Sequence, residues 1–141
     1  PDVISPISDF TKGHFEEVID DSFVTKSKVR RIVLCSGKVF YDLRKEQEIR
    51  SIKDIAIIRL EQLYPFPERQ LARILTKYPK AEKIWLQEEP ENMGARDFIL
   101  RSYKDKIDRI ISRKASASPA TGFMKVHLEE QQAIINSALE K

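Results

Sequence analysis

Short apolar runs alternate with amphipathic stretches along most of this chain. The first run predicts a buried strand at residues 30–35, where Arg-Arg-Ile-Val-Leu-Cys is rich in β-branched side chains. Ser36 and Gly37 follow as a turn, and Val39 and Leu43 then lie four positions apart on one face of a helix. Ser36 is expected to cap that helix by accepting a backbone N–H bond. A strand, a tight turn and an amphipathic helix form the first half of a βαβ unit.

The same alternation continues through the middle of the chain. Residues 55–60 form a near-continuous apolar run, typical of a parallel strand covered on both faces, and residues 83–87 predict the next strand. Between them, Pro67 suits the first turn of a helix that Pro79 ends. One inward-facing stripe on this helix has the spacing i, i+3, i+4 and i+7: Leu71, Ile74, Leu75 and Tyr78.

The last third of the chain predicts two more helices and an outer strand. Asn92 is expected to cap a helix that carries Ala95, Phe98, Ile99 and Ser102 on one face. Residues 107–112 alternate weakly and predict the outer strand, and residues 114–122 are small and polar, which predicts a loop. A final helix at residues 126–139 is expected to turn three side chains inward: Leu128, Ile135 and Leu139.

The first residues have no sustained period. Residues 1–21 are expected to form a linker or N-terminal extension, followed by a short edge strand at residues 22–25 and a single domain over residues 22–141. Strands that alternate with helices imply the α/β class, with a mostly parallel sheet of about five strands and helices on both faces.

Composition narrows the function classes. The 141 residues suit one domain, and a net charge of +3 is too small to indicate a nucleic-acid partner or an anionic membrane surface. Cys35 is the single cysteine, so no internal disulfide is possible and a reducing compartment is expected, such as the bacterial cytoplasm or the mitochondrial matrix. The first residues read as mid-protein sequence, and we expect a piece of a longer protein.

Little in the sequence points to catalysis. No Cys and His residues cluster at metal-ligand spacing, and nothing pairs His14 or His127 with a nucleophile. Cys35 closes an apolar strand and is expected to be a buried, inert thiol. Glu88 and Glu89 could serve as general bases after Gln87, but the favoured interpretation is that this polar group ends the strand and holds the next loop. We therefore predict no catalytic residue and no metal site.

One turn is a candidate anion site. Lys38 stands in the first turn of a helix, where its charge opposes the helix dipole, and a bound anion would remove that conflict. Ser36 and Gly37 would present backbone N–H groups, while Arg59 and Arg113 could reach a phosphate. The strand ending at Cys35 is expected between those ending at Arg59 and Gln87, which would place the turn where strand order reverses. The alternative is that Lys38 points to solvent or pairs with a nearby acid.

Four blocks of sequence, in order, resemble the thiamine-diphosphate-dependent first component of the 2-oxoglutarate dehydrogenase complex. They lie at residues 33–43 (Val-Leu-Cys-Ser-Gly-Lys-Val-Phe-Tyr-Asp-Leu), 59–67 (Arg-Leu-Glu-Gln-Leu-Tyr-Pro-Phe-Pro), 87–95 (Gln-Glu-Glu-Pro-Glu-Asn-Met-Gly-Ala) and 115–122 (Ala-Ser-Ala-Ser-Pro-Ala-Thr-Gly). The similarity is to the C-terminal end of that subunit. It implies a transketolase C-terminal-like domain, a three-layer α/β/α sandwich whose first strand runs antiparallel to the others.

The resemblance also implies a role. The full subunit decarboxylates 2-oxoglutarate on thiamine diphosphate with magnesium and passes the succinyl group to the lipoyl group of the succinyltransferase component in the tricarboxylic acid cycle. The cofactor lies between the two preceding domains, so this piece is expected to be inactive alone and to bind no cofactor. Such C-terminal domains help the subunit form a homodimer, and some bind acetyl-CoA or AMP as regulators.

Two other functions remain open at this stage. The chain could be the same domain of a related thiamine-dependent 2-oxoacid decarboxylase, which sequence upstream of Pro1 would distinguish. It could also be a free-standing nucleotide-binding α/β module, which tight binding by the isolated domain would favour. Trp85, Phe66 and the pair Phe40 and Tyr41 offer large apolar surface, and we expect part of it to serve a dimer interface.

Overall fold

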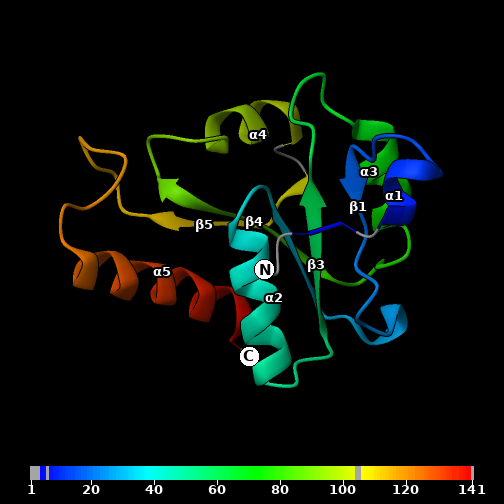
Figure 1. Cartoon of the computed structure of the whole chain (residues 1–141), viewed down its shortest axis with the longest axis horizontal. Helices are drawn as coiled ribbons and strands as arrows, with labels where there is room; N and C mark the ends of the chain where they lie inside the picture. The colour runs from blue at the N-terminus through cyan, green and yellow to red at the C-terminus, as the bar shows by residue number, and fades with distance from the viewer. Residues whose placement is uncertain (1–3, 6, 104–105, 141) are drawn as a thin grey trace.

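A five-stranded sheet forms the centre of the molecule (Figure 1). The computed structural model describes residues 4–5, 7–103 and 106–140. The strands are β1 (Val18–Ile19), β2 (Arg31–Cys35), β3 (Ile55–Leu60), β4 (Glu82–Pro90) and β5 (Arg109–Arg113). The helices are α1 (Ile7–Thr11), α2 (Val39–Ile49), α3 (Glu68–Leu75), α4 (Arg96–Tyr103) and α5 (Met124–Leu139), with a 3-10 turn at Lys26–Lys28. The strand order is β1-β3-β2-β4-β5, and only β1 runs antiparallel to its neighbour.

Two apolar cores cover the two faces of this sheet and make the expected α/β/α sandwich. Side chains of a strand alternate between faces, so Ile32 and Leu34 of β2 pack with α3 and α4, whereas Val33 and Cys35 pack with α2 and α5. All five residues of β2 are buried, as a strand covered on both faces requires. The four residues of the predicted stripe are buried, at most 8% exposed: Leu71, Ile74, Leu75 and Tyr78. The helix is shorter than expected, because α3 ends at Leu75 and not at Pro79, so Tyr78 packs into the core from the turn that follows the helix.

The strand order confirms the expected switch point. β2 lies between β3 and β4, with Val33 opposite Ile57 on one side and Ile84 on the other. α2 leaves the carboxyl end of β2 toward one face, and α3 follows β3 on the opposite face. The turn after Cys35 therefore lies at the carboxyl edge of the sheet, where ligands of open α/β sheets bind.

The expected edge strand at residues 22–25 is wrong, and a shorter strand precedes it. Val18 of β1 pairs with Leu60 of β3 and is buried, so the sheet begins inside the segment expected to be a linker. Asp21 explains why the chain stops being a strand there. Its buried carboxylate accepts the N–H groups of Phe23 (2.6 Å) and Ile57 (2.7 Å), which turns the backbone back onto itself.

Two expected inward-facing side chains are placed differently. Leu128 is 59% exposed, because the first turns of α5 lie beyond the ends of β4 and β5 and have no sheet beneath them (Figure 1). Ile135 and Leu139, farther along α5, are buried as expected. Trp85 is 1% exposed in the core of this chain, so it offers no surface to a partner.

No helix among the described residues is long and apolar enough to cross a bilayer.

Candidate functional site

The turn after β2 differs from the sequence prediction in one respect. Gly37 adopts φ +73°, a backbone conformation that glycine tolerates best, and α2 begins only at Val39. The N-cap residue is therefore Lys38, which makes no side-chain capping bond, and the expected Ser36 cap is wrong.

Lys38 pairs with an acid of its own helix. Its Nζ lies 2.5 Å from Oδ2 of Asp42, one helical turn later, and 64% of its side chain is exposed. This contact supplies the negative charge that a lysine at the start of a helix lacks. An external anion would have to compete with the Asp42 carboxylate for Lys38.

Gln131 of α5 joins this pair to the other strand ends. It is 8% exposed, and its Nε2 donates to Asp42 (3.0 Å) and to Glu88 at the end of β4 (3.1 Å). Its Oε1 accepts a 2.6 Å bond from Nη2 of Arg113, at the end of β5. We call Lys38, Asp42, Glu88, Arg113 and Gln131 the Gln131 network. It connects α2, α5 and the ends of the parallel strands β4 and β5 at the carboxyl edge of the sheet.

Arg113 is the most buried cation of the network, with 5% of its side chain exposed. Its Nη1 lies 3.1 Å from Nδ1 of His127 and 3.6 Å from Oε2 of Glu130. Its Nε is buried and has no hydrogen-bond partner among the described residues. A buried guanidinium donor without a partner is uncommon in folded proteins, because such groups are normally hydrogen-bonded.

Arg59 is the one predicted site residue that joins a different cluster. Its Nη1 donates to the hydroxyl of Tyr41 (2.9 Å), and its Nε lies 3.0 Å from Glu61. Its guanidinium carbon stands 4.5 Å from the ring centroid of Phe40, a cation–π distance. The structure thus brings Lys38 and Arg113 into one network and binds Arg59 to the aromatic side chains of α2. Phe40 and Tyr41, which were expected to offer surface to a dimer partner, therefore contact Arg59 of their own chain.

Gln87 holds the loop after β4, as the favoured interpretation expected, but the polar group does not end the strand, because β4 continues through Glu88 and Glu89 to Pro90. Gln87 is 3% exposed, and its Nε2 donates to the carbonyl groups of Met93 (2.7 Å) and Pro90 (3.1 Å), while its Oε1 accepts from Trp85. Gly94 (φ +68°) lies against this amide, and a Cβ there would meet Gln87 Nε2 at 3.0 Å. Gln87 is therefore a loop anchor.

Asn92 also holds a loop, and its expected role as a helix cap is wrong. Its side-chain amide exchanges two hydrogen bonds with the backbone of Ser116, at 2.9 and 3.0 Å. These bonds join the loop after β4 to the loop after β5. α4 begins only at Arg96, four residues later, so Asn92 lies too far away to cap it.

The remaining nucleophile and metal candidates have no reactive environment among the described residues. Cys35 is fully buried, and burial raises the pKa of its thiol to about 12, so the thiolate is not accessible at neutral pH. The ring of His14 is exposed and lies 3.8 Å from Glu16. Within the described ranges, His, Cys, Asp and Glu residues form no group that would hold a metal ion.

Sequence reasoning missed Gln131 and Asp42, which join the network. A signal for Gln131 was available, because a polar side chain occupies the face of the last helix that also carries Ile134, Ile135 and Ala138. A buried polar group on an apolar stripe requires partners. For Asp42, the i, i+4 spacing from Lys38 was the available signal.

Comparison with known proteins places the chain in a family. A family model described as "2-oxoglutarate dehydrogenase C-terminal" matches residues 4–139. The chain belongs to this family. It is 46% identical over 147 aligned positions to the 2-oxoglutarate dehydrogenase E1 component of Cupriavidus necator, covering 99% of this chain and 16% of that protein. An oxoglutarate dehydrogenase of Buchnera aphidicola is 44% identical with the same coverage. The E1 component of Brucella anthropi is 48% identical over 80% of the chain and 12% of its own length.

Membership of the 2-oxoglutarate dehydrogenase C-terminal family agrees with the resemblance of the four sequence blocks and with the α/β/α fold. The chain spans about 16% of the length of the first two relatives, so most of each relative lies outside the matched region. In this chain the Gln131 network stands at the junction of α2, β4, β5 and α5.

Proposed function

We propose that this chain is the C-terminal domain of a 2-oxoglutarate dehydrogenase first component, with a structural and regulatory role in the subunit. The observation that carries the proposal is the family match over residues 4–139, together with an identity of 44–48% to proteins of that name. The oxidative decarboxylation of 2-oxoglutarate and the transfer of succinyl to lipoyl groups would belong to the whole subunit. The described residues form a packed core and the hydrogen bonds of the Gln131 network, and both features suit a structural role.

Thiamine diphosphate and magnesium would be held by the preceding domains. The described residues contain no carboxylate or imidazole group arranged for a metal ion, and no step of the reaction is assigned to them. A related thiamine-dependent 2-oxoacid decarboxylase is the alternative parent, and the upstream sequence would distinguish the two.

The parent subunit tests this proposal directly. A version of the subunit that lacks residues 4–139 is expected to lose its homodimer and, with it, succinyl-CoA formation by the reconstituted complex. The control is a subunit with the exposed Arg73 of α3 changed to Ala, which should keep both properties. A deleted subunit that stays dimeric and fully active would contradict a structural role for this domain.

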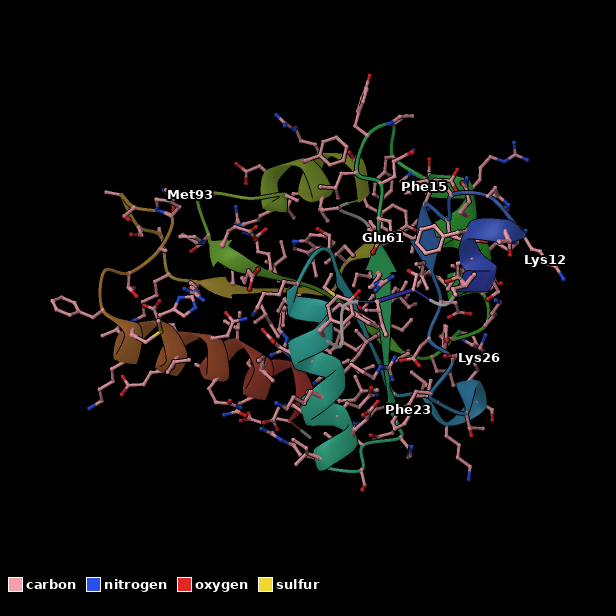
Figure 2. All side chains as sticks on the ribbon, in the orientation of Figure 1. Lys12, Phe15, Phe23, Lys26, Glu61 and Met93 are labelled. Carbon is pink, nitrogen blue, oxygen red and sulfur yellow. The ribbon has the colours of Figure 1, made fainter. Side chains whose placement is uncertain are left out.

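A homodimer partner and the succinyltransferase component are the proposed protein partners. Support comes from large apolar side chains that the fold leaves exposed. One set is at the start of α5: Phe123, Met124 and Leu128. Another is on the N-terminal arm: Ile7, Phe10 and Phe15. Figure 2 shows Phe15 at the side of the molecule that carries β1, near Glu61, with Lys12 projecting into solvent beyond it. Exposed apolar groups of this size are typical of interaction surfaces.

We also propose a regulatory anion site at Ser36, Gly37, Lys38, Arg59 and Arg113, for AMP or acetyl-CoA. Its support is the switch-point position and the unused Nε of Arg113. Asp42 and Glu88 oppose an anion, so binding would require Lys38 to exchange the Asp42 carboxylate for a phosphate.

A titration of AMP and acetyl-CoA into the parent subunit tests this site. Lys38→Ala should weaken binding about tenfold, because a charge-assisted hydrogen bond contributes roughly 1.5–3 kcal/mol. Asp42→Asn should tighten binding, since it frees Lys38 from its ion pair. Equal affinities of the three proteins would leave Lys38 as a surface lysine paired with Asp42.

A further inference from the structure

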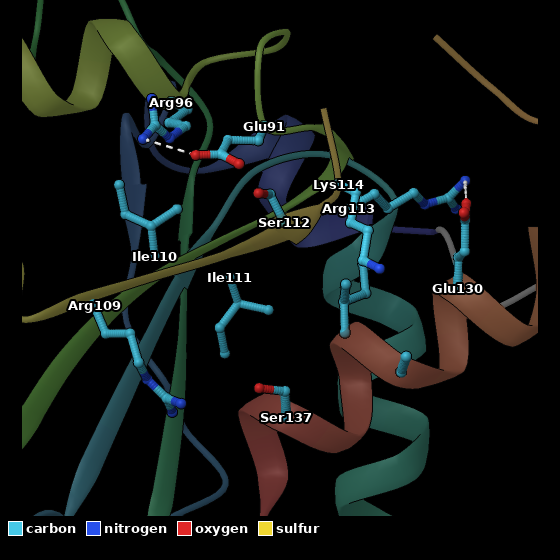
Figure 3. A pocket seen from close by; sticks show the side chains of 12 residues that line it. Glu91, Arg96, Arg109, Ile110, Ile111, Ser112, Arg113, Lys114, Glu130 and Ser137 are labelled. Carbon is cyan, nitrogen blue, oxygen red and sulfur yellow. Dashed lines mark hydrogen bonds and ion pairs between the residues drawn. The ribbon is translucent and has the colours of Figure 1, made fainter. Parts of the chain in front are cut away.

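A cavity runs along the outer edge of β5. Its volume is about 690 Å³, and it is lined by residues 109–114, by one face of α5 and by Glu91 and Arg96 (Figure 3). Consecutive residues of a strand point to opposite faces of the sheet, and Figure 3 shows Ile110 and Ile111 on opposite sides of β5. A cavity that touches every residue from 109 to 114 must therefore follow the edge of the strand.

In the part of the chain that the structure describes, no strand lies beside this edge of β5. β5 is the last strand in the sheet order, and its strand neighbour there is β4. The N–H of Asp108, just before β5, donates to the carbonyl of Lys83 in β4 (2.8 Å) and therefore points toward β4. Backbone polar groups alternate in direction along a strand, so those of Arg109 and Ile111 point away from β4 and into the groove. An unpaired edge of this kind is a template for another strand.

α5 forms the opposite wall of the groove. It contributes Glu130, Ala133, Ile134 and Ser137, so small and apolar side chains face the middle of β5. An edge strand beside a helix forms a channel in which an extended peptide can pair with the strand while its side chains contact the helix. Residues 109–114 would span roughly 17–20 Å at the usual rise of a strand, which matches a bound segment of about six residues.

Cations stand at both ends of this channel. Arg109 lies at the start of β5, and Arg113 and Lys114 lie at its end, with Arg96 across the groove. Three of the four have acidic partners, at 3.3 Å (Arg96 with Glu91), 3.5 Å (Arg109 with Glu82) and 3.6 Å (Arg113 with Glu130). The pairs of Arg96 and Arg109 are solvent-exposed and contribute only about 0–1 kcal/mol each, whereas Arg113 is buried in its pair with Glu130. Lys114 is exposed and has no ion pair among the described residues, so it is the cation of the channel that is free to bind an acid.

The same charges exclude a second copy of β5 as the occupant. Two antiparallel copies would place Arg109 of one chain opposite Arg113 and Lys114 of the other, and like charges across a strand pair are destabilising. We propose that the β5–α5 groove binds an extended segment of a separate protein chain as an added strand, with acidic residues at both ends of the segment and apolar residues between them.

Synthetic peptides test this proposal on the isotope-labelled chain. The probe is the blocked heptapeptide Asp-Glu-Val-Thr-Val-Glu-Asp, and the controls are a lysine version of it and an acidic version with N-methyl groups on alternate residues. Fluorescence anisotropy gives the affinity. Amide hydrogen exchange shows whether the outward N–H groups of Arg109 and Ile111 become protected. Only the unmethylated acidic peptide is expected to bind and to protect these two amides.

Variants separate this groove from the proposed anion site. Lys114→Glu should weaken the binding of the acidic peptide about tenfold or more, because an attractive charge contact becomes a repulsive one. Lys38→Ala and Arg73→Ala are matched controls that should leave its affinity unchanged, and the amide spectrum reports whether each variant is folded. The proposal would be overturned if the acidic peptide did not bind at millimolar concentration or if the methylated peptide bound equally well. It would also be overturned if inorganic phosphate alone displaced the peptide, or if sedimentation showed that the chain dimerises through β5.

Discussion

Single polar side chains hold the backbone of this domain together at its loops. Gln87 donates to the carbonyl groups of Glu89 and Pro90 at the end of β4 and of Met93 in the following loop. Asp21 bonds two backbone N–H groups across the start of the sheet. Arg31 holds the last turn of α5, since its Nη1 donates to the carbonyl groups of Ala138 (3.0 Å) and Glu140 (2.8 Å). A cation at a helix C-terminus is favourable because it offsets the negative end of the helix dipole.

Gln87→Ala should destabilise the domain by about 2–4 kcal/mol, because it leaves the indole N–H of Trp85 and the loop carbonyl groups without their partner. Urea unfolding measures the change. Glu89→Ala, at an exposed position two residues later, is the control and should change the free energy of unfolding by less than about 0.5 kcal/mol. An equal, small loss in both variants would show that water replaces the amide of Gln87.

Asp20 predicts a loss of stability in acid. Burial works to raise the pKa of its carboxyl, but hydrogen bonds from Lys26 (2.6 Å), Tyr78 (2.7 Å) and Lys77 (2.9 Å) outweigh burial and hold that pKa below the ordinary 3.8. A lowered pKa in the folded state favours folding when the group is ionised. Its contribution is therefore complete above about pH 3.8 and is lost as the pH falls through the lower folded-state pKa.

Asp20→Asn tests this sign. At pH 7 the variant should be less stable by about 1–3 kcal/mol, because charge-assisted hydrogen bonds are lost. Unfolding measured from pH 7 to pH 2.5 should show the difference from the unchanged protein shrinking below pH 3.8. Asp9→Asn, at an exposed position of α1, is the control. A difference that stayed constant across this range would assign the effect to packing.

At the scale of the elements, each helix is stable because one face is buried against the sheet. α3 is short, so its eight residues depend on that contact more than on intrinsic propensity. Its stripe contacts β2 and β3 side chains in the core shared with α4. α5 differs along its length, since its first turns expose apolar residues and its last turns are buried.

Leu75→Ala should cost about 2–5 kcal/mol of unfolding free energy, the usual range for a buried leucine. Leu75 is 8% exposed in the α3 core, whereas Arg73 on the same helix is exposed and serves as the matched control. Denaturant unfolding gives both values. A loss below about 0.5 kcal/mol for Leu75→Ala would mean that α3 does not pack as described.

The whole molecule is a packed sandwich, and the two surfaces for which a function is proposed lie at edges of the sheet. The Gln131 network occupies the carboxyl edge, and the proposed strand-binding groove follows the free edge of β5. Both depend on α5, because this helix supplies Gln131 to the network and the second wall to the groove.

The isolated chain should not bind thiamine diphosphate. We expect no heat of binding when thiamine diphosphate and magnesium are titrated into the 141-residue chain, because the cofactor residues would belong to the preceding part of the subunit. The parent subunit, titrated in the same buffer, is the positive control. Micromolar binding at one site per isolated chain would contradict this assignment.

Hydrophobic period alone determined the larger elements of this protein. The strand at residues 55–60 and the stripe on α3 were predictable because a buried strand and an amphipathic helix each impose a spacing on the sequence. The order of β2 between β3 and β4 followed from the tendency of sequential parallel strands to pair. The loop role of Gln87 followed from a polar group near a strand end.

Only the tertiary structure decided the rest, because the deciding contacts join residues far apart in the chain. Gln131 meets Asp42 across 89 positions, and Asp21 stops a strand by bonding Ile57 from 36 positions away. Leu128 follows the helical period and is still exposed, because the sheet ends before it. The period of a sequence states which face of an element is apolar, whereas the extent of its neighbours decides how much of that face is covered.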